Sequence, residues 1–257
     1  MKKNYLLTAL LIIFLSAAPA AAHEVWALAV DPEVGSPATV VFGYGHVYPG
    51  RDTLEAADFD SRFNPPKLTG PAGDVPVERG KDAMTYLSSE PLSAGTYTVS
   101  AESKPGFGSR TPDGYKRGSK TEFPDATACT YSHRYGKEVI SLEGQASGFD
   151  KPLGHALEIV PQADPTAVKV RQALPVKVLF DGKPRRGVQL TAFFVGFTPD
   201  NSASAFAAST GKEGSVDFIP LAPGSWLLKA EMEGDYSDKA VCDRESWEAT
   251  LIFDVSE

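Results

Sequence analysis

The chain has 257 residues, of which 25 are lysine or arginine and 33 are aspartate or glutamate, so its formal net charge is −8. Phosphate binding needs a basic face, and this acidic balance therefore argues against a nucleic-acid partner. The length fits one large domain or two small ones, and with only two cysteines the chain is not a small fold held together by disulfides.

Residues 1–22 have the three parts of a secretory signal peptide. Two lysines precede an apolar run, and Ala20 and Ala22 occupy the small-residue positions of an A-x-A cleavage site. The apolar run is shorter than the ~20 residues that favour a membrane span, so an uncleaved anchor is the less favoured alternative. We expect a periplasmic protein that begins at His23 and has no membrane span in its mature part.

Runs of alternating apolar residues, separated by the turn-forming residues Gly, Pro and Asp, predict β-strands along the rest of the chain. The clearest runs are Ala38–Phe42, Gly95–Ala101, Val176–Phe180, Val188–Phe194, Trp226–Ala230 and Ala249–Val255. No long stretch has a 3.6-residue apolar period. The predicted fold class is therefore all-β.

Two prolines interrupt the strand-like pattern between Val160 and Ala167, which places a predicted domain boundary there. We expect two immunoglobulin-like β-sandwich domains, residues 23–162 and residues 163–257, after the cleaved signal peptide. An Asp-Gly pair at Asp181 predicts a hairpin turn in the second domain. This second half contains no histidine, so we expect a structural or docking role for it.

All four histidines fall in the predicted first domain, at His23, His46, His133 and His155. Strand parity places His46 on one face with Val40, Phe42 and Tyr44, and the two nearby glycines allow another backbone or a ligand to approach closely. The less favoured alternative for His46 is a core histidine that bonds a backbone carbonyl. A solvated strand histidine explains His133 nearly as well as a metal ligand does, and for His155 both alternatives stay open.

His23 differs because of its chemistry as an amino-terminal residue. A chain that begins with histidine offers its α-amine and its ring Nδ1 atom to one metal ion, in a six-membered chelate. The ~8 pKa of an α-amine lets a metal deprotonate it near neutral pH. With one or two further imidazoles, the resulting nitrogen-rich site suits Ni(II) or Cu(II), and it also accepts Zn(II).

Several segments resemble the periplasmic proteins of bacterial nickel-uptake systems, the NikK-like family that shares the domain named after the NikM transporter subunit. These segments are His23–Trp26, Gly43–Pro49, Asp113–Lys120, Cys129–Lys137, Gly154–Pro161 and Val178–Pro184. The resemblance implies a protein that binds Ni(II) and delivers it to inner-membrane subunits of an energy-coupling-factor type nickel/cobalt transporter. It implies His23, His46, His155 and, with the weakest match, His133 as metal ligands.

Two other functions remain as alternatives to nickel delivery by a non-enzymatic protein. One is a copper histidine-brace protein, either a chaperone or an oxygen-activating enzyme. The other is a metal-free envelope structural module. Co(II) and Zn(II) are further candidate metals, because geometry and availability, besides affinity, decide which ion is bound.

The two cysteines and one basic segment each have two possible interpretations. Cys129 and Cys242 form either one disulfide or two buried thiols, since sequence does not place their Cα atoms. The segment from Lys104 to Lys120 is basic within an acidic chain, and it is either a solvated loop or a surface that docks a partner.

Overall fold

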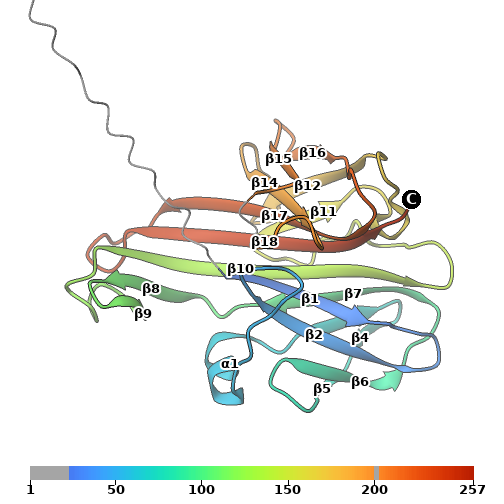
Figure 1. The fold of residues 1–257 in the computed structure, drawn as a ribbon, viewed down its shortest axis with the longest axis horizontal. Helices are drawn as coiled ribbons and strands as arrows, with labels where there is room; N and C mark the ends of the chain where they lie inside the picture. Colours follow the sequence, from blue (N-terminus) through green and yellow to red (C-terminus); the bar gives the residue numbers. More distant parts are fainter. Residues whose placement is uncertain (1–22, 200–202) are drawn as a thin grey trace, which may run out of the picture.

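The computed structural model describes residues 23–199 and 203–257, so the predicted signal peptide lies outside the described residues. One four-stranded sheet contains β1 (Glu24–Val30), β2 (Pro37–Gly45), β5 (Val77–Arg79) and β6 (Thr85–Pro91). A second four-stranded sheet contains β11 (Leu157–Pro161), β12 (Leu174–Phe180), β13 (Lys183–Pro184) and β16 (Ser215–Phe218). Between them lies a ten-stranded sheet (Figure 1).

The ten-stranded sheet combines strands from both halves of the chain. Its members are β3 (Lys67–Gly70), β4 (Gly73–Val75), β7 (Gly95–Glu102), β8 (Gly106–Thr111), β9 (Gly114–Arg117), β10 (Ala128–Leu142), β14 (Gln189–Phe194), β15 (Phe206–Ser209), β17 (Gly224–Asp235) and β18 (Arg244–Val255). The described residues also include the helix α1 (Ala56–Arg62) and the 3₁₀ turn η1 (Pro165–Ala167). The prediction of an all-β sandwich fold is confirmed, and each of the six expected runs lies largely or wholly within a strand.

The two hydrophobic cores lie on opposite faces of the ten-stranded sheet. Side chains alternate between the two faces of a strand, and on β10 Tyr135 belongs to one core whereas Leu142 belongs to the other. The core with Leu142 packs against β1 and β2, and the core with Tyr135 packs against β11 and β12. Each core therefore uses a different face of the same central strand.

The predicted boundary between residues 162 and 163 falls just after β11. That strand pairs with β12, so Leu157–Pro161 lies in the sheet of the second sandwich. Strand β10 pairs with β7 on one side and with β18 on the other. The two sandwiches therefore share a continuous sheet, which the prediction of two successive domains did not include.

Strand β1 pairs with β2 along one edge, and its other edge rests on the ten-stranded sheet. The Thr250 hydroxyl donates to the Val25 carbonyl at 2.7 Å, and the Ala29 amide donates to Glu138 Oε2 at 2.6 Å. These side chains satisfy backbone groups that would otherwise be buried without partners. They also fix where the amino end of β1 lies relative to β10 and β18.

Trp26 on β1 fills the junction between the two sandwiches, together with Tyr48, Phe193, Leu227 and Ile252. A Cβ atom at position 43 would lie 1.9 Å from the Trp26 indole, so only glycine fits there. The predicted approach of another backbone is found at Gly45, where a Cβ atom would lie 2.9 Å from the Gly50 carbonyl oxygen, whereas at Gly43 the approaching group is a side chain.

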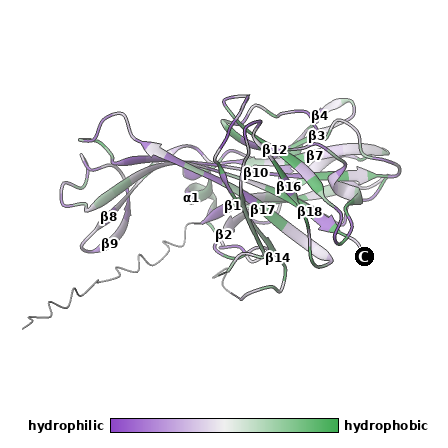
Figure 2. Cartoon of the chain, turned by 90° about the horizontal axis from the view of Figure 1, so that it is seen from above, coloured by the Kyte–Doolittle hydropathy of each residue, from purple (hydrophilic) through white to green (hydrophobic). Residues whose placement is uncertain are grey.

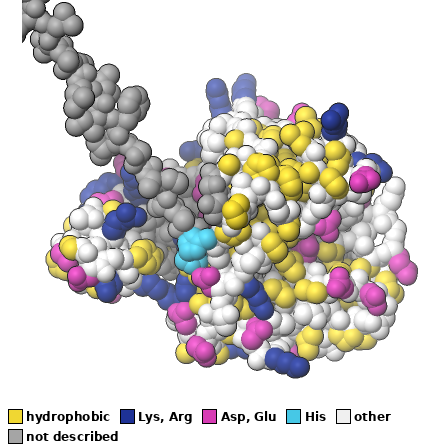
Figure 3. All heavy atoms as spheres, viewed as in Figure 1, with side chains coloured by type: hydrophobic (Ala, Val, Ile, Leu, Met, Phe, Trp, Pro, Cys, Tyr) yellow, Lys and Arg dark blue, Asp and Glu magenta, His cyan; other side chains and the backbone are white. Residues whose placement is uncertain are grey.

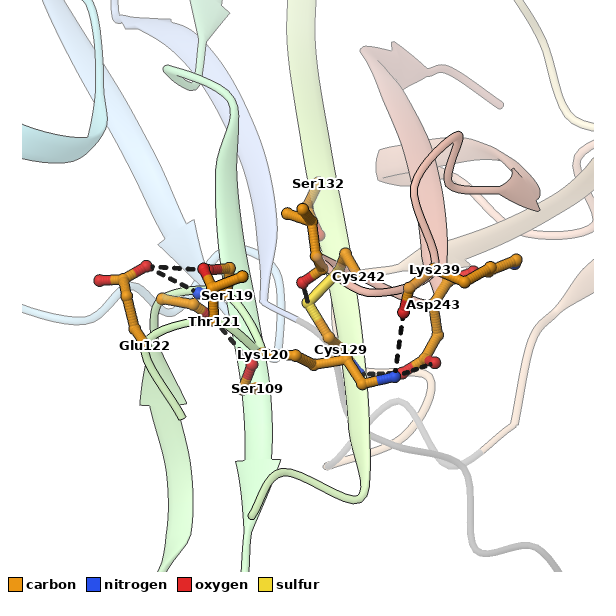
Figure 4. The surroundings of a disulfide bond; sticks show 12 residues. Ser109, Ser119, Lys120, Thr121, Glu122, Cys129, Ser132, Lys239, Cys242 and Asp243 are labelled. Carbon is orange, nitrogen blue, oxygen red and sulfur yellow. Dashed lines mark hydrogen bonds and ion pairs between the residues drawn. A yellow bond between two sulfur atoms is a disulfide. The ribbon is translucent and has the colours of Figure 1, made fainter. Parts of the chain in front are cut away.

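The arm, which we define as β8, β9, residues 128–132 of β10 and residues 236–243, projects beyond both sandwiches (Figure 2). A disulfide between Cys129 and Cys242 joins two of its segments, with the Cα atoms 5.0 Å apart. Beside the disulfide, Asp243 accepts from the Cys129 amide at 2.8 Å and from Lys120 Nζ at 2.6 Å (Figure 4). The structure thus settles the cysteine question in favour of the bridge.

The basic segment predicted between Lys104 and Lys120 forms the β8–β9 hairpin of this arm. Every residue of β9 is exposed. Among the described residues, no helix combines the length and the apolar character that crossing a membrane requires.

Candidate metal centre

His23 and His46 meet at the start of β1 and the end of β2. The register pairs Glu24 with Gly45 and Val25 with Tyr44, so the next pair places His23 opposite His46. Because the backbone groups of Val25 point away from β2, this next pair is of the non-hydrogen-bonded kind, in which side chains approach most closely. The two imidazole centroids lie 3.7 Å apart with their planes tilted by 49°.

Tyr44 also packs against the ring of His23. The two rings stack with centroids 4.4 Å apart and an interplanar angle of 9°, and the Arg62 guanidinium covers Tyr44 at 4.4 Å from its centroid. The predicted face is confirmed, because Phe42 and Tyr44 lie in the first core and the imidazole pair continues their row. Figure 3 shows histidine side chains on the surface between the arm and the sandwiches.

Asp52 contacts the ring of His23 through one particular nitrogen. Nε2 of His23 lies 2.8 Å from Oδ2 of Asp52. A carboxylate accepts and does not donate, so Nε2 carries the hydrogen, and in the neutral ring the lone pair then resides on Nδ1. Nδ1 is the ring nitrogen that closes a chelate with the α-amine of the same residue.

The surroundings of the His23 ring favour its uncharged form. Burial lowers the pKa of His23, and the nearby His46 and Arg134 lower it further, while Asp52 opposes these effects. The side chain is still 29% exposed. A neutral and partly accessible imidazole is the form that binds metal ions.

His133 lies elsewhere, on β10. Its Nε2 atom is 2.8 Å from Oε1 of Glu245, its ring stacks on Trp247, and the edge of Tyr131 meets it. Tyr135 is on the same face of β10 and belongs to the second core. His133 therefore shares its face of the sheet with the second sandwich, whereas Arg134, next to it, faces the His23 side.

His155 lies just before β11. Its ring stacks on Tyr135 with centroids 4.8 Å apart, and burial lowers its pKa. A small cavity beside it is lined by seven residues, including Lys67 and Glu102. The structure thus brings together His23 and His46 and gives His133 and His155 other aromatic neighbours.

In residues 23–199 and 203–257, no group of three or more His, Cys, Asp or Glu side chains is spaced to hold a metal ion. At His23 and His46 a third donor would therefore have to be something other than one of these side chains. The α-amine of an amino-terminal His23 is such a donor. The ligand roles of His133 and His155 stay predictions.

Buried charges lie behind the histidine pair. Lys229 Nζ is 3.1 Å from Glu24 Oε1 and 3.2 Å from Glu231 Oε1. Burial raises the pKa of Glu248 to about 7, although Arg134 and Lys229 oppose this shift. Glu24 Oε2 and Glu248 Oε1 are buried and have no hydrogen-bond partner within the described part of the chain.

Sequence reasoning missed Asp52, Glu248 and Arg134. Asp52 reaches His23 because the chain turns back after β2, where the Asp52 amide donates to the Tyr44 carbonyl at 2.8 Å. The only sequence signal for that turn is the Tyr-Pro-Gly segment at Pro49. Glu248 and Arg134 come from distant strands, so no local pattern indicates them.

These features define an all-β protein of two sandwiches with a histidine pair at the amino end of its first described strand. The chain belongs to the family described as a domain of unknown function (DUF4198), whose model matches residues 20–234. A comparison with curated proteins gives no match.

Two solved structures illustrate the fold similarity of this chain. The D0-D1 domain of Intimin is 15% identical, with a TM-score of 0.23, and the match covers 90% of this chain and 97% of that one. The ectodomain (Ig1-Ig3) of mouse nectin-like molecule 4 is 10% identical, with a TM-score of 0.21, and the match covers 92% of this chain and 65% of that one. These similarities are too low to bear on function.

Proposed function

We propose that this chain is a periplasmic nickel-binding protein that delivers Ni(II) to the inner-membrane subunits of a nickel/cobalt transporter of the energy-coupling-factor type. The observation that carries the metal site is the contact between Asp52 and Nε2 of His23, because it leaves Nδ1 as the metal-binding nitrogen. The resemblance of several segments to nickel-uptake proteins supports the choice of metal and partner.

In this proposal the α-amine and Nδ1 of His23 form the chelate, and His46 supplies a further nitrogen. The contact between the two imidazole rings, with centroids 3.7 Å apart, supports the proposal because a modest separation of the rings would let them share an ion. Asp52 and Tyr44 hold the His23 ring in place, which reduces the ordering that binding requires. The partial exposure of His23 leaves a route for the ion to enter and to pass to a partner.

The direct test is a calorimetric titration of Ni(II) into protein that begins at His23, with X-ray absorption to identify the ligands. We expect one ion per chain and a nitrogen-rich first shell. The same protein extended by Ala22 has lost the α-amine chelate and should bind Ni(II) more weakly. Equal affinities for the two starts would contradict the proposed site.

A copper histidine brace is the second candidate, because the same amine, Nδ1 and second imidazole suit Cu(II). This candidate predicts that the copper-loaded protein consumes oxygen and forms peroxide when a reductant is added. Nickel delivery predicts no such reaction. If protein purified gently from the periplasm holds no metal, a metal-free structural role is favoured over both.

A further inference from the structure

Glu248 on β18 is a buried carboxylate with one unsatisfied oxygen. The residue is 7% exposed, and its Oε1 atom has no hydrogen-bond partner in the described part of the chain. A buried carboxylate without a partner is costly, so such an oxygen calls for an explanation. The described side chains supply none, which leaves the main chain at the amino end of β1 as a candidate.

The contacts of β1 show how it lies along β10 and β18. Thr250 Oγ1 donates to the Val25 carbonyl, and a Cβ atom at position 136 would lie 2.8 Å from the same carbonyl. Gly136 and Thr250 are themselves paired between β10 and β18. Further along, Glu138 contacts Ala29, so β1 and β10 run in the same direction (Figure 1).

Two residues earlier on each strand, we expect three groups to lie near one level. Arg134 pairs with Glu248, and two residues before Val25 is His23. Successive residues of a strand advance by about 3.3 Å, so two residues span about 7 Å on each strand, and we expect His23 near the level of Arg134. Arg134 acts electrostatically on both His23 and Glu248, which agrees with this placement.

The main-chain nitrogen of His23 also points towards this edge. Backbone groups alternate along β1, and those of Val25 and Ala29 point away from β2 towards β18 and β10. His23 has the same parity, so its nitrogen points the same way.

We propose that Glu248 is the hydrogen-bond acceptor for the α-amino group that signal cleavage creates at His23. This inference rests on the amino terminus that the proposed function requires, but not on the identity of the metal. An α-ammonium has three N–H groups, and an amine bound to a metal keeps two. Glu248 can therefore hold the amino group in the metal-free protein and orient it when a metal binds, as outer carboxylates orient metal-bound histidines.

A double-mutant cycle tests the contact. One variable is the first residue of the protein, which is either His23 or Ala22, and the other is the residue at position 248, which is either Glu or Gln. Unfolding by urea is measured with a chelator present at about pH 6, below the ~8 pKa of an ordinary α-amine. With the His23 start, Glu248→Gln should raise the unfolding equilibrium constant. With the Ala22 start it should leave the constant unchanged or lower it, so that the coupling is at least about tenfold, or about 1.4 kcal/mol.

Glu138→Gln is the matched control, because it makes the same substitution at another buried glutamate below β1, at a site away from His23. Its effect should be the same with both starts. The assignment would be overturned if Glu248→Gln changed the unfolding constant equally with both amino termini. It would also be overturned if Glu24→Gln, and not Glu248→Gln, depended on which residue comes first. If Glu248→Gln does not fold with either start, Glu248→Asp replaces it in the same cycle with the same criterion.

A nickel titration of the same proteins separates this inference from the proposed function. Coupling without nickel binding supports the Glu248 contact and refutes only the nickel site. Nickel binding without coupling between residue 248 and the amino terminus supports the nickel site and refutes the role of Glu248.

Discussion

The Nε2 atom of His23 lies 2.8 Å from Oδ2 of Asp52, and the same distance separates Nε2 of His133 from Oε1 of Glu245. The two histidines thus have equivalent carboxylate partners but different surroundings. Only His23 has a second imidazole against its ring and an α-amine within its own residue. This equivalence makes each pair a control for the other.

Removing the Asp52 carboxylate should weaken Ni(II) binding, because the His23 ring then loses the partner that fixes its tautomer. Asp52→Ala should lower the affinity by about 10- to 100-fold, the range found when outer-shell partners are removed. Asp52→Asn should lower it less, since the amide oxygen still accepts from Nε2. Calorimetric titration measures both, and Glu245→Gln should leave the affinity unchanged. A similar loss from Glu245→Gln would move the site towards His133.

The four histidines should differ in their contribution to metal affinity. His23→Ala should cost the most, more than about 100-fold, because a lost ligand costs more than a lost outer-shell partner. His46→Ala should come next, then His155→Ala, and His133→Ala should cost least. Titrations of the four variants, with circular dichroism to check folding, give the order. A larger loss at His133 than at His46 would contradict the site described above.

Glu138 should make the protein less stable as the pH rises. Burial raises the pKa of Glu138 from 4.5 to about 8 in the folded chain. Between these values the unfolded chain loses a proton that the folded chain keeps, so stability falls as pH rises. Glu138→Gln removes this dependence and still offers an acceptor to the Ala29 amide.

The gain in stability from Glu138→Gln should be small near pH 4 and about 3 kcal/mol at pH 7, at ~1.4 kcal/mol for each unit of pKa shift. Urea denaturation across this range measures it. A gain that does not change with pH would show that Glu138 ionises normally in the folded chain.

The disulfide should stabilise the fold substantially, because Cys129 and Cys242 are 113 residues apart in the sequence. A crosslink across a loop of this length contributes about 3–5 kcal/mol by restricting the unfolded chain. Reduction, or the paired change of both cysteines to serine, should lower the unfolding free energy by that amount. The serine variant should not respond to reductant, whereas a response would reveal an unrelated effect of the reagent.

The local pattern of the sequence determined the all-β class and the main strands. Alternating apolar residues predicted β7, β12 and β18 because burial of one strand face leaves that period in the sequence. The Asp181-Gly182 pair predicted the turn between β12 and β13, where both residues have positive φ. Parity along β2 also placed Tyr44 and His46 together.

Tertiary structure alone decided what surrounds His23. Asp52 reaches it through a turn, while Arg134 comes from a strand more than a hundred residues away in the sequence. The same holds for the shared ten-stranded sheet and for the disulfide. Strand pairing between distant segments leaves no periodic signal in either segment, because a strand shows which face it buries but not which strand lies beside it. The amino acids therefore indicated that His23 was chemically special, and only the fold supplied its neighbours.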